Sequence, residues 1–409
     1  MTGRYREILA LPGALAFSIA GLIARFPISF LGLGILLFVQ GVTGSYGTAG
    51  GVVAAYFLAQ ALANPFHGKR IDRLGQAKVM VPLCVINVSA IVLLMLTVYA
   101  GLPLLVTGVF AAIAGASIGA VGSLIRARWS HVTRTPKQLD LAFSWEAVLD
   151  EILFVSGPII VTALATALFP PAGLILSILT TTVGSFLLYR QTDTEPPAVP
   201  KETDKVLKGK VLSNPGILLT VVAHFLLGAA FGAIDVVAVA FAEEQGHKEL
   251  SGLLLAAFAL GSLFAGLVFG AIDWKIPTHR RQAMAVTFYA ALTWLLLIPA
   301  NFWGFMGLLF VAGAGIAPAL ISTSTSVKAL APTGRLTEAF AWMTTFMGAG
   351  AAAGSAVGGM AIDAFGARPS FLVPVACTTI AALLVNVFVT LMNPTKHGHE
   401  ARKARRLAV

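Results

Sequence analysis

Long apolar segments follow one another along almost the whole chain, separated by short polar stretches. Each is close to or longer than the roughly 20 residues that an α-helix needs to cross a bilayer. A helix satisfies its backbone polar groups internally, so it is the structure that such segments favour in lipid. The pattern predicts an all-α integral membrane protein with twelve transmembrane helices. The predicted spans are 13–40, 46–66, 80–99, 103–127, 140–168, 171–190, 215–243, 249–271, 283–301, 302–327, 336–362 and 367–392.

The composition excludes a water-soluble globule. Of the 409 residues, 57% are hydrophobic and 11% are charged, with a mean hydropathy of +0.86, whereas soluble domains carry roughly 25% charged residues. Both cysteines, Cys84 and Cys377, lie in apolar runs. We therefore expect small buried side chains there, with no disulfide framework and no metal site. No cofactor is predicted.

The positive charge is distributed as a membrane protein requires. With the N-terminus in the cytoplasm, 25 of the 28 lysines and arginines fall in cytoplasmic segments. Lys248 and Arg368 lie on the other side, and Arg25 lies within the first span. Cytoplasmic loops favour positive charge, so both termini are predicted to be cytoplasmic in a multi-pass protein of the plasma (inner) membrane. The bilayer thus explains the net charge of +10, and no nucleic acid partner is expected. The first span is too long to be a cleavable signal peptide.

The chain repeats itself after six spans. The interval 191–212 is the longest polar one, and we interpret it as a cytoplasmic linker that acts as a plain tether. Leu-Pro-Gly at 11–13 opens span 1, and Asn-Pro-Gly at 214–216 opens span 7. Two pseudo-symmetric six-helix halves are therefore predicted. The parts are an N-terminal half (1–190), the linker (191–212), a C-terminal half (213–393) and a basic cytoplasmic tail (394–409).

A glycine-bounded, charged stretch lies between the second and third spans, and we interpret it as a tight basic turn. Its characteristic residues are Gly68, Asp72, Arg73, Gly75 and Lys78. The stretch resembles the signature loop of the major facilitator superfamily, G-x-L-x-D-[RK]-x-G-[RK]-[RK], which joins helices 2 and 3. It departs from that pattern where Gln76 and Ala77 replace a basic pair.

The resemblance implies a fold and a mechanism. It implies two six-helix halves that rock about a substrate site near the middle of the membrane. It also implies that Asp72 meets the first turn of helix 11, around 335–338, when the cytoplasmic side is closed. A carboxylate is stabilised at a helix N-terminus, so these signature residues are predicted to form a conformational lock.

Charged residues inside the spans are the candidates for coupling. Burying a charge at the bilayer centre costs about 2.5–3.5 kcal/mol on insertion scales, so such groups are expected to be paired. Counted from the cytoplasm, Arg25 in span 1 and Asp150 and Glu151 in span 5 reach similar depths. We predict that one carboxylate pairs with Arg25 while another binds a proton. The alternative is a static network that joins the two helices.

Glu146 lies nearer the cytoplasmic end of span 5, and we expect it to form a structural ion pair with Arg126 or Arg128. His224 in span 7 is a candidate for proton binding, or a hydrogen-bonded interior histidine. Asp235 is predicted near the outer end of span 7, where it either gates the mouth or is a solvated end residue.

Gly157-Pro158 in span 5 resembles the end of the G-x(3)-G-P-x(2)-G-G element of the antiporter branch, although only Gly-Pro matches. A proline within a helix permits a bend, which indicates either a gating bend or ordinary curvature. Many antiporters of this superfamily also carry an arginine in helix 4, in the pattern R-x-x-Q-G. That arginine is missing from 111–117 here, so Arg25 would take its role.

Together these features predict a secondary active transporter that works by alternating access. Spans rich in Leu, Ala, Phe and Val favour a hydrophobic or amphipathic small molecule, exported against protons, by a monomer. The alternatives are an uptake symporter or a uniporter, and, from another class, a non-transporting sensor or scaffold. No H-E-x-x-H, G-x-S-x-G or phosphate-loop motif is present, so an enzyme is not expected.

Overall fold

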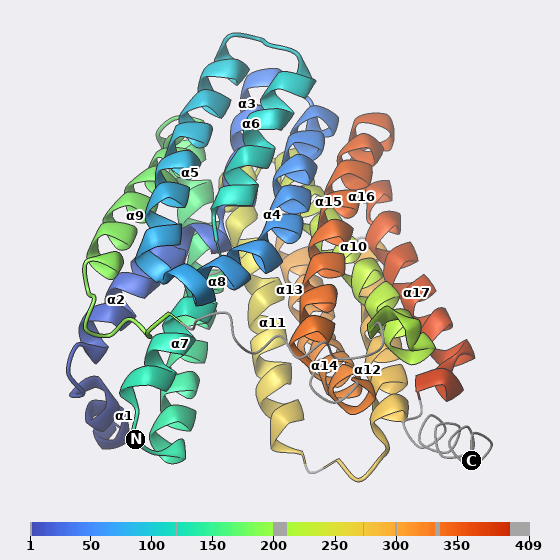
Figure 1. Ribbon diagram of the computed structural model, residues 1–409. Helices are drawn as coiled ribbons and strands as arrows, with labels where there is room; N and C mark the ends of the chain where they lie inside the picture. Colours follow the sequence, from blue (N-terminus) through green and yellow to red (C-terminus); the bar gives the residue numbers. More distant parts are fainter. Residues whose placement is uncertain are drawn as a thin grey trace. The chain divides into compact units, whose positions relative to one another are not determined.

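The computed structural model of the chain describes residues 2–119, 121–198, 211–272, 274–298, 301–331 and 336–392. All regular structure in these ranges is helical (Figure 1), so the predicted all-α fold is confirmed. The helices of membrane-spanning length are α4 (Tyr46–Leu74), α5 (Gln76–Tyr99), α8 (Pro136–Ala167), α9 (Ala172–Tyr189), α10 (Pro215–Glu244), α11 (Ser251–Ala271) and α15 (Leu336–Phe365).

Other spans are assembled from consecutive shorter helices. These are α6 (Leu104–Ser117) with α7 (Val121–Val132), α13 (Phe302–Gly313) with α14 (Ile316–Leu330), and α16 (Ala367–Ser370) with α17 (Leu372–Val387). Within the described residues, ten helical stretches are long and apolar enough to cross a membrane, or eleven with one bent pair. The ninth predicted span is occupied by α12 (Thr278–Thr293), which has 16 residues and continues into the short 3-10 helix η4 (Trp294–Leu297).

The first predicted span is broken rather than continuous. It consists of α2 (Ala14–Arg25), a 3-10 turn η1 (Phe26–Ser29) and α3 (Leu31–Thr43), with a bend of 42°. Pro27 explains the break, because proline cannot donate the backbone hydrogen bond that an α-helix requires. The break leaves Arg25 as the last residue of α2. Irregular turns within a helix are often found at functional positions.

The expected turn at 68–78 is mostly helix, which corrects the sequence interpretation. α4 continues through Gly68 to Leu74, and α5 starts at Gln76. Only Gly75 interrupts them, with φ of +93°, a conformation that glycine adopts without strain. Gly68 is an ordinary helical residue, because a Cβ placed there would meet nothing within 4 Å.

The chain divides into two compact units. Unit 1 comprises Met1–Asp204 and Ala242–Ala256, and unit 2 comprises Lys205–Phe241 and Ala257–Val409. The end of α10 and the start of α11, with the 3-10 turn η3 (Lys248–Leu250) between them, therefore pack with unit 1. The domain boundaries from the sequence stay a prediction.

Unit 1 holds a buried cluster that includes Phe17 of α2, Trp129 of α7 and Leu188 of α9. The short helix α1 (Thr2–Leu9) adds Ile8 to the same cluster. Phe17 and Trp129 meet edge to face with ring centroids 4.8 Å apart. This cluster fixes α2 against α7, which positions the polar groups described below.

Small residues join α10 and α15 within unit 2. A Cβ at Gly350 would collide with the backbone of Phe225, and one at Gly354 with the backbone of Ala229. Glycine therefore allows the two helices to approach closely, as small residues commonly do between membrane helices.

Candidate functional site

The site is built on α8, which begins one turn earlier than its apolar segment suggests. Thr135 caps the helix by accepting a hydrogen bond from the Gln138 amide, and Pro136 occupies the first helical position. Both residue types favour a helix start. Glu146 therefore lies ten residues into α8, about 15 Å from its start, and faces α2 together with Asp150, one turn on.

Glu146 is completely buried, and both of its carboxylate oxygens have partners. One carboxylate oxygen accepts hydrogen bonds from the Ser18 hydroxyl at 2.8 Å and from the Trp129 indole N–H at 2.7 Å. The other oxygen pairs with the Arg25 guanidinium. Burying a carboxylate is costly unless it is paired and hydrogen-bonded, and here both conditions are met. Glu146 is thus an anchor between α2, α7 and α8.

This pairing corrects the expectation for Glu146. Its partner is Arg25, whereas Arg126 pairs with Asp150 and Arg128 belongs to a different cluster. The reason is geometric: α8 turns Glu146 toward α2, where it meets both Ser18 and Arg25.

Asp150 lies between two arginines. One oxygen is 3.3 Å from Arg25 Nε, and the other accepts a hydrogen bond from Arg126 Nη2 at 3.0 Å. The exposed fraction of its side chain is 27%, against 0% for Glu146 and 45% for Arg126. Asp150 is therefore the carboxylate of this cluster that is open to the surroundings, while Glu146 is fully buried.

The guanidinium of Arg25 does not use all of its hydrogen-bond donors. Its side chain is 3% exposed, and its Nε and Nη1 atoms are buried without a hydrogen-bond partner. With Arg126, Glu146 and Asp150 it forms a four-residue cluster whose formal charges balance. Loss or gain of one proton would leave an uncompensated charge in a largely dry environment. We refer to Arg25, Arg126, Glu146 and Asp150 as the charge cluster.

The other titratable candidates are not part of this cluster. Glu151 is half-buried on the next position of α8, and it makes no ion pair or hydrogen bond within the described part of the chain. His224 and Asp235 belong to α10 in unit 2. They are eleven residues apart, about 16 Å along the helix.

His224 is buried, and its Nδ1 atom has no hydrogen-bond partner. Asp235 is half-buried among residues of unit 2 and lies close enough to Tyr289 of α12 to interact with it electrostatically. It is thus directed into the helix packing of unit 2.

Gly157 serves close packing. A Cβ at this position would meet the Ser29 side chain and Phe30, so glycine lets α8 lie directly against the break in the first span. Pro158 is accommodated inside α8, which runs without interruption from Pro136 to Ala167. Its role as a gating bend stays a prediction.

The conformational lock falls largely outside what the structure describes. The side chains of Asp72 and of 336–338 are not described, and residue 335 lies outside the described residues. Arg73 and Lys78 are exposed. The lock itself stays a prediction.

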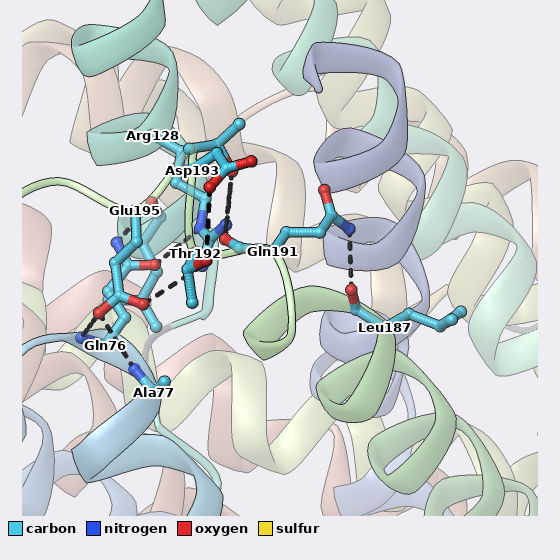
Figure 2. A network of polar contacts seen from close by, with 10 residues as sticks. Gln76, Ala77, Arg128, Leu187, Gln191, Thr192, Asp193 and Glu195 are labelled. Atoms are coloured by element: carbon cyan, nitrogen blue, oxygen red, sulfur yellow. Dashed lines mark hydrogen bonds and ion pairs between the residues drawn. The ribbon is translucent and has the colours of Figure 1, made fainter. Parts of the chain in front are cut away.

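A second polar cluster, which the sequence analysis missed, lies at the start of α5 (Figure 2). Arg128 of α7 is fully buried and donates hydrogen bonds to Gln76 Oε1 at 2.8 Å and to the Gln191 carbonyl and Thr194 hydroxyl at 2.7 Å each. Glu195 Oε1 accepts from the backbone amides of Gln76 at 2.5 Å and Ala77 at 3.3 Å, and Glu195 Oε2 is 4.0 Å from Arg128 Nη2.

The linker is therefore not a plain tether throughout. Its first residues are bound to unit 1: Gln191 and Thr194 to Arg128 of α7, and Glu195 to the start of α5. Residues 199–210 lie outside the described residues. Glu195 supplies the acceptor that α5 lacks, because the preceding Gly75 has no side chain. A Cβ on Gly75 would also crowd Glu195 Oε1. The sequence feature that could have indicated this contact is the acidic residue Glu195 in the linker.

A third cluster ties the turn between α10 and α11 to α3 and α4 inside unit 1. Glu243 accepts hydrogen bonds from the Tyr46 hydroxyl at 2.5 Å, from Lys248 Nζ at 2.8 Å and from Gln40 Nε2 at 3.2 Å. Lys248 also donates to Gln40 Oε1 at 2.5 Å. The sequence analysis noted only Lys248, as a cation on the outer side. No group of three or more potential metal ligands occurs within the described residues.

Comparison with known proteins agrees with this architecture. The sequence matches the Major Facilitator Superfamily over residues 15–299 and 249–409. A bacterial homologue of the iron transporter ferroportin, in an inward-facing state, is 16% identical with a TM-score of 0.70, covering 92% of this chain and 98% of that one. A nucleoside transporter is 13% identical with a TM-score of 0.71, covering 91% and 99%.

A bacterial homologue of the human lysosomal transporter Spinster is also 13% identical, with a TM-score of 0.71, covering 96% of this chain and 98% of that one. At these identities the likeness concerns the fold alone. No curated protein matches the sequence.

Proposed function

This chain belongs to the Major Facilitator Superfamily and is a membrane transporter, and on that premise we propose that it exports a hydrophobic or amphipathic small molecule in exchange for protons. It acts by rocker-switch alternating access, as a monomer, and has no enzymatic activity. The observation that carries the proposal is the position of Asp150 between a buried and a half-exposed arginine.

Asp150 is the proton-binding residue. Its side chain is partly exposed, whereas Glu146 is fully buried and both of its carboxylate oxygens already have partners. Protonation of Asp150 removes one negative charge from the charge cluster and leaves Arg25 and Arg126 in excess. Uncompensated buried charge is costly, so protonation favours a rearrangement of α2, α7 and α8. Arg25 Nη1, which is buried without a hydrogen-bond partner, allows Arg25 to change partners during that movement.

Glu151 is the accessory carboxylate. It lies beside Asp150 and has no ion-pair partner within the described residues. A second carboxylate beside the first disfavours double ionisation, so the pair holds one proton more readily than Asp150 would alone. His224, with its unpartnered ring nitrogen, is the reserve candidate in unit 2.

The substrate class follows from the composition of the helices. Sugars and other polar substrates need many hydrogen-bonding groups in a site, whereas Leu, Ala, Phe, Val and Gly dominate these spans. A compound that partitions into the bilayer suits such walls. An uptake symporter or a uniporter is the alternative, since the same charge cluster could couple movement in either direction.

The test is proton movement in everted membrane vesicles that contain the full chain. A pH-sensitive dye reports proton flux when members of a panel of amphipathic dyes are added. Wild type is compared with Asp150→Asn, Glu151→Gln and a matched control, Glu249→Gln, whose side chain is 56% exposed. We expect compound-evoked flux in wild type and control, and none in Asp150→Asn.

Flux that survives in both Asp150→Asn and Glu151→Gln would refute the assignment and direct attention to His224 and Asp235. Movement of the compound without any proton flux in wild type would instead support a uniporter.

A further inference from the structure

Unit 2 contains an apolar groove that the transport mechanism does not use. It is lined by side chains of α11, α12 and the α13–α14 pair, and by Ile272, Trp274 and Ile276 between α11 and α12. Its volume is about 510 Å³. The side chains that line it include Phe264, Val268, Phe269, Met284, Phe288 and Phe310.

These lining residues are open to the surroundings. The exposed fractions are 56% for Phe264, 64% for Val268, 58% for Met284 and 48% for Phe288. In a membrane protein, exposed apolar surface of this kind faces acyl chains. A groove that can admit a ligand of this volume is also within the size range of small-molecule sites, but such sites usually carry several convergent polar groups.

Among the described residues, Arg281 is the one charged residue that lines the groove. Its Nε atom is buried without a hydrogen-bond partner, and its guanidinium lies 6.0 Å from the centre of the Phe269 ring. No carboxylate pairs with it in the described part of the chain; Asp273 lies outside that part. An arginine held in an apolar environment with an unused donor is a site for an anion.

The surroundings of Arg281 are also positive. Lys275 and Arg280, which precede it in the sequence, are both exposed. Arg281 lies in the first turns of α12, whose N-terminus has no side-chain cap, and helix N-termini favour anions. Trp274 lines the groove and donates to the Phe269 carbonyl at 3.0 Å, as expected for an aromatic residue at a membrane interface.

We propose that this groove binds an anionic phospholipid of the predicted cytoplasmic leaflet. The phosphate contacts Arg281, and an acyl chain lies along Phe264, Val268 and Phe288. Such a lipid fits the groove because its single phosphate can pair with the cation of Arg281, while its long acyl chains contact the apolar side chains. Basic pockets between transmembrane helices on the cytoplasmic side recognise anionic headgroups in this way.

The test is native mass spectrometry of the purified full chain. The protein is incubated with equal amounts of dioleoyl-phosphatidylglycerol and dioleoyl-phosphatidylcholine, and retained lipid is identified by mass. We expect about fivefold preference for phosphatidylglycerol, the effect of one well-placed arginine. Arg281→Gln removes the preference, Arg281→Lys restores part of it, and Arg280→Gln, an adjacent exposed arginine outside the groove, keeps most of it.

A second pair of variants tests the groove itself. Ala265 lines it and Leu267 does not, so Ala265→Phe is expected to lower retention of both lipids while Leu267→Phe leaves it unchanged. Equal losses in Arg281→Gln and Arg280→Gln would overturn the proposal in favour of diffuse surface charge. Equal retention of both lipids by wild type would also overturn it, as would displacement of the lipid by a transported compound.

Discussion

Glu146→Gln is the substitution that most directly probes the charge cluster. Glutamine has the same shape, so its amide oxygen can still accept from Ser18 and Trp129. Its amide nitrogen must then face Arg25, which places two donors against each other. The substitution also leaves Arg25, only 3% exposed, with Asp150 alone as its counter-charge at 3.3 Å.

The magnitude follows from the burial of this pair. Removing one partner of a buried ion pair costs about 3–5 kcal/mol because the other charge stays buried. Asp150 still compensates Arg25 in part, so we expect the lower end of that range, about 3 kcal/mol. The Glu249→Gln control changes an exposed side chain and should stay within about 0.5 kcal/mol of wild type.

The assay is reversible unfolding of the purified chain in mixed micelles, followed by far-ultraviolet circular dichroism. Arg25→Gln and the double variant Arg25→Gln/Glu146→Gln complete a double-mutant cycle. Because the double variant leaves neither charge unpaired at this contact, we expect the cycle to give a coupling of about 2 kcal/mol or more. A loss below about 1 kcal/mol in Glu146→Gln would refute the view that Glu146 anchors the site.

Two other predictions concern the signature residue Asp72 and the linker residue Glu195, which contacts the start of α5. Glu195→Ala removes the acceptor for the first amides of α5 and the counter-charge 4.0 Å from Arg128, and should lower the unfolding free energy by about 1–2 kcal/mol. Asp193→Ala, exposed in the same segment, is its control, and equal values for the two would contradict the capping role. Asp72→Asn should lower transport without changing expression or thermal stability, because the proposed lock acts in one conformation only. Wild-type transport by a well-expressed variant would rule the lock out.

Much of the fold follows from the sequence because lipid imposes a simple rule on the backbone. Uninterrupted apolar runs such as Gln76–Tyr99 became single helices. The break at Phe26–Ser29 was missed although Pro27 was visible, because hydropathy alone does not sense a missing backbone donor. At Gly68 the error was opposite: charged residues were interpreted as a turn, although charges continue a helix readily once it leaves the apolar layer.

The charge cluster was only partly predictable. Depth counting brought Arg25 and Asp150 together, because both helices start on the same side. It could not identify Glu146 as the buried partner, since that depends on where α8 starts and which face it turns toward α2. The contacts of Arg128 and Glu195 join segments that are 67 residues apart in sequence, and no local pattern encodes such a meeting.

The most direct test of the central claim separates coupling from transport itself. Full-chain protein with Asp150→Asn is reconstituted in liposomes, and one compound found to evoke proton flux is followed in two modes. In the first mode a pH gradient drives accumulation, and in the second the labelled compound exchanges for unlabelled compound without a gradient. If Asp150 carries the proton, gradient-driven accumulation is lost and exchange persists. Accumulation at the wild-type level would contradict the account, and so would the loss of exchange in a protein that unfolds like wild type.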